Sequence, residues 1–156
     1  DQRGRHHGRD RLRASGLSVV FFTDRDLGLK FPTTLREAGL TVETHRDHFP
    51  PTCPDSTWLA AVAAKQWVAL THDARIRYKP NELAEVVRHR VTLLVVMGKA
   101  PYPDLAKSFV VTVPRVLAFL ASHEPPVIGK VYRATPRELA RNAQAPGRVE
   151  LWFPRA

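Results

Sequence analysis

The chain has 156 residues, 44% hydrophobic and 25% charged, and a net charge of +9 from 24 basic and 15 acidic residues. These values are ordinary for one soluble globular domain. No segment approaches the ~20 apolar residues of a membrane span, and the N-terminus lacks the apolar core of a signal peptide. The single cysteine, Cys53, cannot form an intramolecular disulfide. We therefore expect a cytoplasmic protein without a membrane partner.

The positive charge suits a polyanionic partner, of which nucleic acid is the commonest. Excess arginine also occurs in proteins that bind no nucleic acid, so the charge alone leaves this open. Five of the arginines lie within residues 1–16, which contain a single leucine. That composition cannot bury a core and predicts a disordered basic tail, which either contacts RNA or has no role.

From residue 17 onward the apolar pattern alternates between strand and helix periods. Expected strands are 17–22, 40–45, 67–71, 91–97, 127–134 and 148–153. Expected helices are 31–39, 55–65, 80–90, 103–123 and a turn at 135–142. Pro114 predicts that the helix at 103–123 is bent or broken, and residues 46–54, with three prolines, predict a loop. This alternation is typical of an α/β domain with a mostly parallel sheet. The part from about residue 125 is expected to form an edge hairpin.

Three aspartates lie at the ends of predicted strands or at the start of a predicted helix, and these positions predict a shared site. Asp24 ends the first strand, Asp55 begins the helix after the second, and Asp73 follows the third. In a parallel sheet these positions lie on one edge, where α/β proteins bind their ligands. Each residue alone has an ordinary explanation as a turn or helix-capping residue. Their common placement favours a site.

Clustered carboxylates need a counter-charge, because two of them ~4 Å apart repel by roughly 4 kcal/mol at an effective dielectric constant of 20. Oxygen ligands without a nearby cysteine favour Mg²⁺ or Mn²⁺ over zinc. Asp26 is a candidate additional residue of the metal site, either as a direct ligand or as a group that hydrogen-bonds to the ligands. Thr71 is placed to hydrogen-bond a carboxylate or a metal-bound water, although a β-branched strand residue explains it equally well.

Basic side chains surround the predicted acidic edge. The candidates for binding phosphate oxygens are Arg25, Arg75, Arg77 and Lys79. A solvated loop in a basic protein is the simpler explanation. His45, His48 and His72 fall near the same edge, but their irregular spacing predicts solvent-facing loop residues rather than zinc ligands.

Three stretches together resemble a known family: FFTDRDLG at 21–28, DHFPPTCPDSTWL at 47–59 and WVALTHDARIR at 67–77. They are similar to the PIN-like domain of VapC-type toxins over about residues 19–121. The resemblance implies a three-layer αβα fold and a metal-dependent endoribonuclease of a type II toxin–antitoxin module. It also implies an RNA substrate, a cognate antitoxin that blocks the site, and a homodimer.

By position in the motifs, the resemblance implies that Asp24, Asp55, Asp73 and Thr71 carry catalysis and that the three acids bind Mg²⁺ or Mn²⁺. The family's fourth acid shortly after the third is replaced here by Ala74 and Arg75, which puts a full two-metal site in question. The resemblance further implies a PIN-like domain at 17–124. Residues 125–156 form an extension that we expect to pack on or beside it.

Alternative functions remain at this stage. Asp24 and Asp26 form a D-x-D pair after a buried strand, as in haloacid-dehalogenase-like phosphatases, where Asp24 would be the nucleophile. No later acid pair completes that arrangement. A receiver-like regulatory domain needs its central aspartate one strand earlier than Asp73. A PIN-like module that binds RNA without cleaving it is the third alternative.

Overall fold

The computed structural model describes residues 19–75 and 79–155, and it confirms the α/β class with a mostly parallel sheet. The strands are β1 (Val20–Thr23), β2 (Thr41–Thr44), β3 (Val68–Thr71), β4 (Thr92–Val96), β5 (Val127–Tyr132) and β6 (Arg148–Phe153). The helices are η1 (Arg25–Leu27), α2 (Lys30–Glu37), α3 (His45–His48), α4 (Asp55–Ala64), α5 (Pro80–His89), α6 (Tyr102–Ser122) and α7 (Pro136–Arg141). The expected tail at 1–16 lies outside the described residues.

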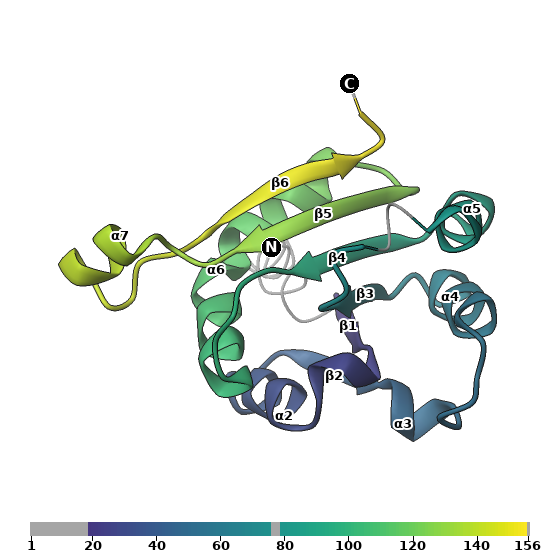
Figure 1. Ribbon diagram of the computed structural model, residues 1–156, viewed down its shortest axis with the longest axis horizontal. Coiled ribbons are helices and arrows are strands. Elements are labelled where there is room, and N and C mark those ends of the chain that lie inside the picture. Colours follow the sequence, from purple (N-terminus) through teal and green to yellow (C-terminus); the bar gives the residue numbers. More distant parts are fainter. Residues whose placement is uncertain (1–18, 76–78, 156) are drawn as a thin grey trace, which may run out of the picture.

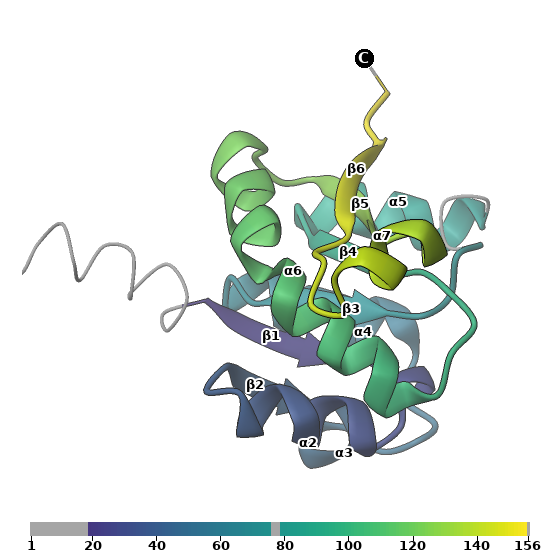
Figure 2. The same cartoon turned by 90° about the vertical axis from the view of Figure 1, so that its left-hand side faces the viewer.

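The six strands form one sheet in the order β2-β1-β3-β4-β5-β6. All neighbours are parallel except β5 and β6, which pair antiparallel at one edge of the sheet. Helices α2 and α6 cover one face and α4 and α5 cover the other (Figures 1 and 2). The expected three-layer architecture is therefore present.

Successive residues of the central strands enter two separate cores. Phe21 packs with α2 and α6, whereas Phe22 packs with α4. Leu93 and Leu94 alternate in the same way, and all four side chains have no exposed surface. A strand buried on both faces needs apolar residues at every position. This explains why the sequence shows continuous apolar runs at β1 and β4 rather than alternation.

Of the two predictions for helix α6, the break at Pro114 is wrong, because α6 continues through this residue as one helix of 21 residues. Proline removes a single helical N–H, and packing of one side of α6 against the sheet and α2 outweighs that loss. By length and composition alone α6 could cross a membrane, so the statement that no segment reaches that size is wrong. Its apolar side chains Leu105, Phe109 and Val116 are buried in the domain core.

Residues 125–156 contribute β5 and β6 to the same sheet. Between these strands an arm carrying α7 extends beyond the carboxyl end of β5 (Figure 1). Arg115 on α6 donates a 2.6 Å hydrogen bond to the carbonyl oxygen of Gly147, and the Gly147 N–H donates to Oγ1 of Thr112 at 2.9 Å. A Cβ atom at Gly147 would lie 1.6 Å from the Tyr132 carbonyl oxygen, so only glycine fits where the arm returns to the sheet.

Candidate functional site

Adjacent strands β1 and β3 end side by side, and this places Asp24 next to Thr71. The Asp24 N–H donates a 2.9 Å hydrogen bond to the Leu70 carbonyl oxygen, which extends the strand pairing by one residue. Oδ1 of Asp24 then accepts from the Arg25 N–H at 2.7 Å and caps the short helix η1. One turn of this helix brings Asp26 back to the same edge. The local fold therefore presents two carboxylates where the sequence suggests a capping residue.

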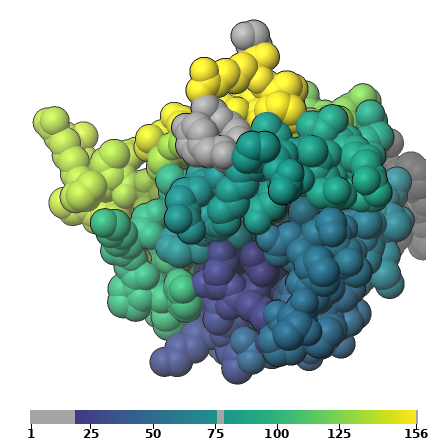
Figure 3. Space-filling model, turned by 45° about the vertical axis from the view of Figure 1, so that its right-hand side comes forward, coloured from purple at the N-terminus to yellow at the C-terminus, as the bar shows by residue number. Residues whose placement is uncertain are grey.

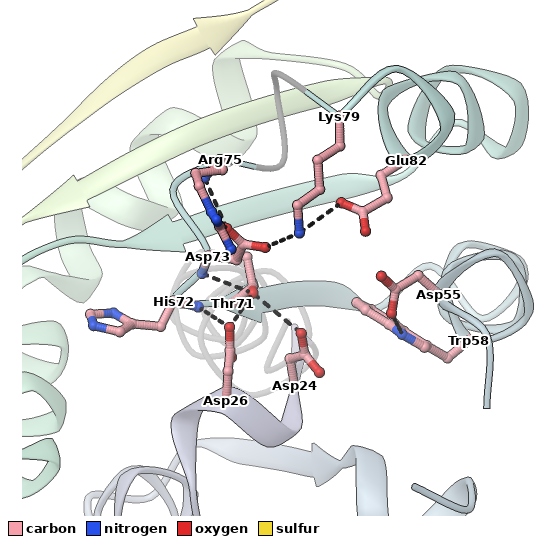
Figure 4. Close-up of polar contacts among 10 residues, drawn as sticks. All are labelled: Asp24, Asp26, Asp55, Trp58, Thr71, His72, Asp73, Arg75, Lys79 and Glu82. Carbon is pink, nitrogen blue, oxygen red and sulfur yellow. Dashed lines mark hydrogen bonds and ion pairs between the residues drawn. The ribbon is translucent and has the colours of Figure 1, made fainter. Parts of the chain in front are cut away.

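Thr71 lies between these two carboxylates (Figure 4). Its buried hydroxyl is 2.9 Å from Oδ2 of Asp26 and 3.3 Å from Oδ2 of Asp24. The backbone N–H of His72 donates a second bond to Oδ2 of Asp26 at 3.0 Å. Oδ1 of Asp26 is buried and has no hydrogen-bond partner among the described residues. A buried carboxylate oxygen without a partner is costly, so this atom indicates a missing cationic or donor group.

The ionised forms of both aspartates are disfavoured at this position. Burial, together with the nearby charge of Asp26, raises the pKa of Asp24 to about 6. Asp55 adds to the same repulsion. Burial also raises the pKa of Asp26, although the bonds from Thr71 and His72 counteract part of the effect. A bound cation would reverse these shifts, because it stabilises the charged carboxylates.

The second acidic pair comes from helices α4 and α5, which pack against each other. Asp55 is the first residue of α4, and its Oδ1 accepts a 2.8 Å hydrogen bond from Nε1 of buried Trp58. Glu82 lies in the first turn of α5, and its carboxyl group is near that of Asp55 (Figure 4). Burial, followed by the interactions with Asp55, raises the pKa of Glu82 to about 7. The Glu82 carboxyl is therefore partly protonated at neutral pH.

Glu82 is absent from the acids predicted from the sequence. The criterion that selected Asp55, an acid in the first turn of a helix at the carboxyl edge, would also have selected Glu82. Glu82 was missed because it lies outside the three sequence motifs from which the aspartates were chosen.

Asp73 lies at the same edge but is bound to cations. Its Oδ2 is 2.6 Å from Nζ of Lys79, and its Oδ1 accepts from the Arg75 N–H at 3.0 Å. Burial raises the pKa of Asp73, but the bonds from Lys79 and Arg75 outweigh burial and hold that pKa below its usual value. Lys79 also lies 3.7 Å from Glu82, so it connects the two acidic groups (Figure 4).

The acids that the sequence placed at one edge do gather there. The segment after β1 lies between the α3–α4 region and the region that leads into α5 (Figure 3). Within residues 19–75 and 79–155, however, no three carboxylate, histidine or cysteine groups lie close enough to hold one ion. Asp24 and Asp26 form one pair, Asp55 and Glu82 another, and Asp73 pairs with Lys79.

The donor set nevertheless fits Mg²⁺ or Mn²⁺. All donors are oxygens, and the buried Oδ1 of Asp26 lacks a partner in the described chain. Mg²⁺ keeps several waters and is commonly bound by only one or two carboxylates. Two carboxylates such as those of Asp24 and Asp26 are therefore enough to hold such an ion.

Arg25 is turned toward the protein. Its Nε donates to Nδ1 of His45 at 2.8 Å, and its Nη2 donates to the Phe49 carbonyl oxygen at 2.8 Å. These bonds hold α3 and the following loop against β1, which gives Arg25 a structural role beside the predicted phosphate-binding one. Arg75 is exposed and Lys79 half-buried at the acidic edge. Arg77 lies outside the described residues.

The expectation that His45 faces solvent is wrong, since its exposed fraction is 3%. The sequence predicted a loop from residue 46, but residues His45–His48 form α3, whose first residue points into the core beside Phe22 and Trp58. Burial, followed by the charge of Arg25, lowers the pKa of His45. The neutral ring can accept the hydrogen bond from Arg25 at Nδ1.

Replacing Arg25 with methionine is expected to lower the free energy of unfolding by about 1–3 kcal/mol, because His45 Nδ1 and the Phe49 carbonyl oxygen each lose a donor. Urea unfolding monitored by tryptophan fluorescence measures this. Arg46→Met is the control, since Arg46 is the exposed neighbour on α3. Equal stability of the two variants would show that the bonds of Arg25 contribute nothing to the fold.

Comparison with known proteins gives two matches to this architecture. Residues 19–98, about half of the chain, match the family model described as "PIN like domain". A 71-residue stretch is 38% identical to the "Putative ribonuclease VapC45" of Mycobacterium tuberculosis (strain ATCC 25618 / H37Rv). That stretch covers 42% of this chain and 51% of the relative, so the matched region spans about half the length of the relative. No solved structure matches.

Proposed function

We propose that this chain, which belongs to the PIN-like domain family, is a divalent-metal-dependent endoribonuclease and the toxin of a type II toxin–antitoxin module. The observation that carries the proposal is the Asp24–Asp26 carboxylate pair, held by Thr71 at the carboxyl edge of the sheet, with one buried oxygen that has no partner in residues 19–75 and 79–155. The pair lies within the matched residues 19–98. The name of the M. tuberculosis relative supports an RNA substrate.

In this proposal Asp24 and Asp26 bind Mg²⁺ or Mn²⁺ directly, and Asp55 and Asp73 contribute through water. An ion bound there neutralises charge on the phosphodiester and activates water. Thr71 fixes the orientation of both carboxylates through its hydroxyl. The pKa of Glu82, raised to about 7 by burial and by nearby Asp55, would let this carboxyl group take up or release a proton near neutral pH.

The cations at the edge complete the proposed site. Lys79 and Arg75 now neutralise Asp73, and a phosphate group of RNA would compete for the same donors. Arg77 is proposed to contact the RNA backbone beside them. The net charge of +9 favours association with a polyanion. The proposed partners are RNA, a cognate antitoxin and a second copy of the chain in the cytoplasm, without a membrane.

The test is incubation of the full chain with single-stranded RNA and Mn²⁺, with EDTA added to parallel samples. We expect cleavage with Mn²⁺ and none with EDTA, and products that carry a 5′-phosphate and a 3′-hydroxyl. A 2′,3′-cyclic phosphate would indicate metal-free chemistry instead. RNA binding that weakens with salt, without cleavage at any metal concentration, would identify a non-catalytic module.

The phosphatase alternative makes a different prediction at the same residue. A haloacid-dehalogenase-like enzyme would form a phosphoaspartyl adduct at Asp24, detectable by mass spectrometry of the intact protein. The comparisons favour the PIN-like assignment, and we expect no adduct.

Replacing Trp58 with phenylalanine is expected to reduce cleavage by up to about 10-fold, the low end of the effect of losing an outer contact of a metal site, because Asp55 is itself proposed to act through water. The change keeps a buried aromatic ring beside Phe22 but removes the Nε1–H bond that orients Asp55. Trp67→Phe is the matched control, because Trp67 also stacks on Phe22 but does not contact Asp55. If both variants lose the same activity, the loss comes from core packing and the positioning role of Trp58 is wrong.

A further inference from the structure

A hollow of about 520 Å³ lies beside the acidic edge. Its lining consists of Asp26, His72, Asp73, Ala74, Arg75 and Tyr102. Holding a metal ion needs only the carboxylates of this set. Metal binding does not require the rings of His72 and Tyr102 or the guanidinium of Arg75. Such groups are the ones that bind nucleotides, because aromatic rings stack on bases and a guanidinium binds phosphate oxygens.

Tyr102, the first residue of α6, is fixed in place at this hollow. Its hydroxyl donates a 2.6 Å hydrogen bond to the backbone carbonyl oxygen of Asp26. The ring packs over Gly28, where a Cβ atom would lie 3.1 Å from Cδ2 of Tyr102. Gly28 has φ +68, a conformation that other residues rarely adopt. A larger residue at position 28 would therefore strain the turn and displace the ring.

His72 has a defined hydrogen-bonding state at the same place. Its Nδ1 is 2.7 Å from the Val96 carbonyl oxygen, which can only accept, so Nδ1 carries the proton. In the neutral ring Nε2 is then an acceptor, and it has no hydrogen-bond partner in the described part of the chain. The rings of His72 and Tyr102 are almost perpendicular, with centroids 6.0 Å apart and an interplanar angle of 85°.

Both residues bond to Asp26, whose Oδ1 has no hydrogen-bond partner within the described residues. The His72 N–H bonds to Oδ2 of Asp26, and the Tyr102 hydroxyl bonds to its backbone oxygen. In Figure 4 the His72 ring extends away from Asp55 and Glu82, while Asp26 itself lines the hollow. Because Asp26 belongs to both the hollow and the carboxylate pair, a nucleotide bound in the hollow would lie next to the acids.

We propose that this hollow binds one unpaired nucleotide next to the scissile phosphate of single-stranded RNA. The base stacks on Tyr102, a donor group of the nucleotide bonds to Nε2 of His72, and Arg75 contacts the adjoining phosphate. This inference rests on the proposed ribonuclease function. A paired base is already stacked within its helix, so the hollow selects single strands over duplexes.

Binding without cleavage tests the proposal directly. The affinity of the full chain for a fluorescein-labelled six-nucleotide RNA is measured by fluorescence anisotropy in EDTA. Tyr102→Leu should weaken binding roughly 5- to 150-fold, the effect of losing one stacked base, whereas Tyr102→Phe should bind nearly as well as the wild type. His72→Phe keeps a flat ring without the acceptor and should weaken binding about 2- to 10-fold.

Tyr132→Leu is the matched control, because Tyr132 is a half-buried tyrosine on β5 that contacts Arg148 outside the hollow. The same RNA annealed to its complement should bind less tightly than the single strand to the wild type. Thermal melting checks that each variant is folded. If Tyr102→Leu does not fold, the affinity of His72→Phe and the comparison of single-stranded with duplex RNA still test whether the hollow binds a nucleotide.

The two proposals fail in distinguishable ways. Wild-type affinity in both Tyr102→Leu and His72→Phe would overturn the nucleotide-binding hollow even if the protein cleaves RNA. Absence of Mn²⁺-dependent cleavage, with binding still lost in Tyr102→Leu, would overturn the nuclease proposal and leave the hollow as an RNA-binding site.

Discussion

Replacing Asp24 with asparagine is expected to reduce RNA cleavage at least about 10³-fold and to make the metal-free protein more stable. A divalent ion contributes several kcal/mol to the stabilisation of developing charge, and each 1.36 kcal/mol corresponds to a factor of ten in rate. Asparagine keeps the shape of the side chain and the oxygen that caps η1. It removes the negative charge that the ion requires.

The gain in stability follows from the raised pKa of Asp24. In the unfolded chain this carboxyl titrates near 3.8, whereas in the folded protein its pKa is about 6. The folded state therefore binds the proton more tightly, and stability falls as pH rises from about 4 to about 6. Above pH 6 the cost reaches up to about 3 kcal/mol, since each pKa unit corresponds to 1.36 kcal/mol. Asparagine avoids this cost.

The measurement is thermal unfolding of Asp24→Asn and wild type in EDTA across pH 4 to 8. The difference in Tm should be small at pH 4 and reach roughly 6–12 °C at pH 7, given about 2–4 °C per kcal/mol for a chain of this size. Asp47→Asn is the control, because Asp47 is an exposed aspartate on α3 that pairs with Arg36 and is not one of the proposed metal-binding acids. A destabilised Asp24→Asn variant at pH 7 would mean that the carboxylate is not a strained group. Unimpaired cleavage would remove Asp24 from the site.

Much of the fold could be predicted because its signals are local. The buried strands β1 and β4 appear as continuous apolar runs, and Pro80 marks the start of α5. The alternation of strands and helices then determines the layers. The sequence does not show where tertiary packing outweighs the local preference of a residue. Pro114 has a strong local preference to break a helix, but burial of α6 against the sheet outweighs it.

The sequence predicted which edge of the sheet carries the candidate site, but it did not predict the side-chain contacts within the site. The rule for parallel strands correctly placed Asp24, Asp55 and Asp73 at one edge. Which acid pairs with which depends on side-chain directions and on helix packing, as the Asp55–Glu82 pair shows. The same limit applies to Arg25, whose charge suggested a surface role although its bonds point inward to His45.

Mn²⁺ is expected to stabilise the wild-type protein at pH 8 and to lose this effect at pH 5. An ion at 100 times its dissociation constant contributes about 2.7 kcal/mol, which corresponds to a rise in Tm of roughly 5–10 °C. Binding requires the ionised carboxylates, so protons compete with the ion below the pKa of Asp24, about 6. The apparent affinity should then fall up to about tenfold for each pH unit.

Thermal unfolding with and without Mn²⁺, at pH 5 and pH 8, measures this stabilisation in wild type, Asp24→Asn and Asp47→Asn. We expect a large rise in Tm at pH 8 for the wild type and Asp47→Asn and little change for Asp24→Asn. Residues 1–18 contain two histidines that could bind Mn²⁺, but they are identical in all three proteins. The comparison therefore isolates the acidic edge. Equal stabilisation of Asp24→Asn, or a rise in Tm that is the same at both pH values, would place the ion somewhere other than the Asp24–Asp26 pair.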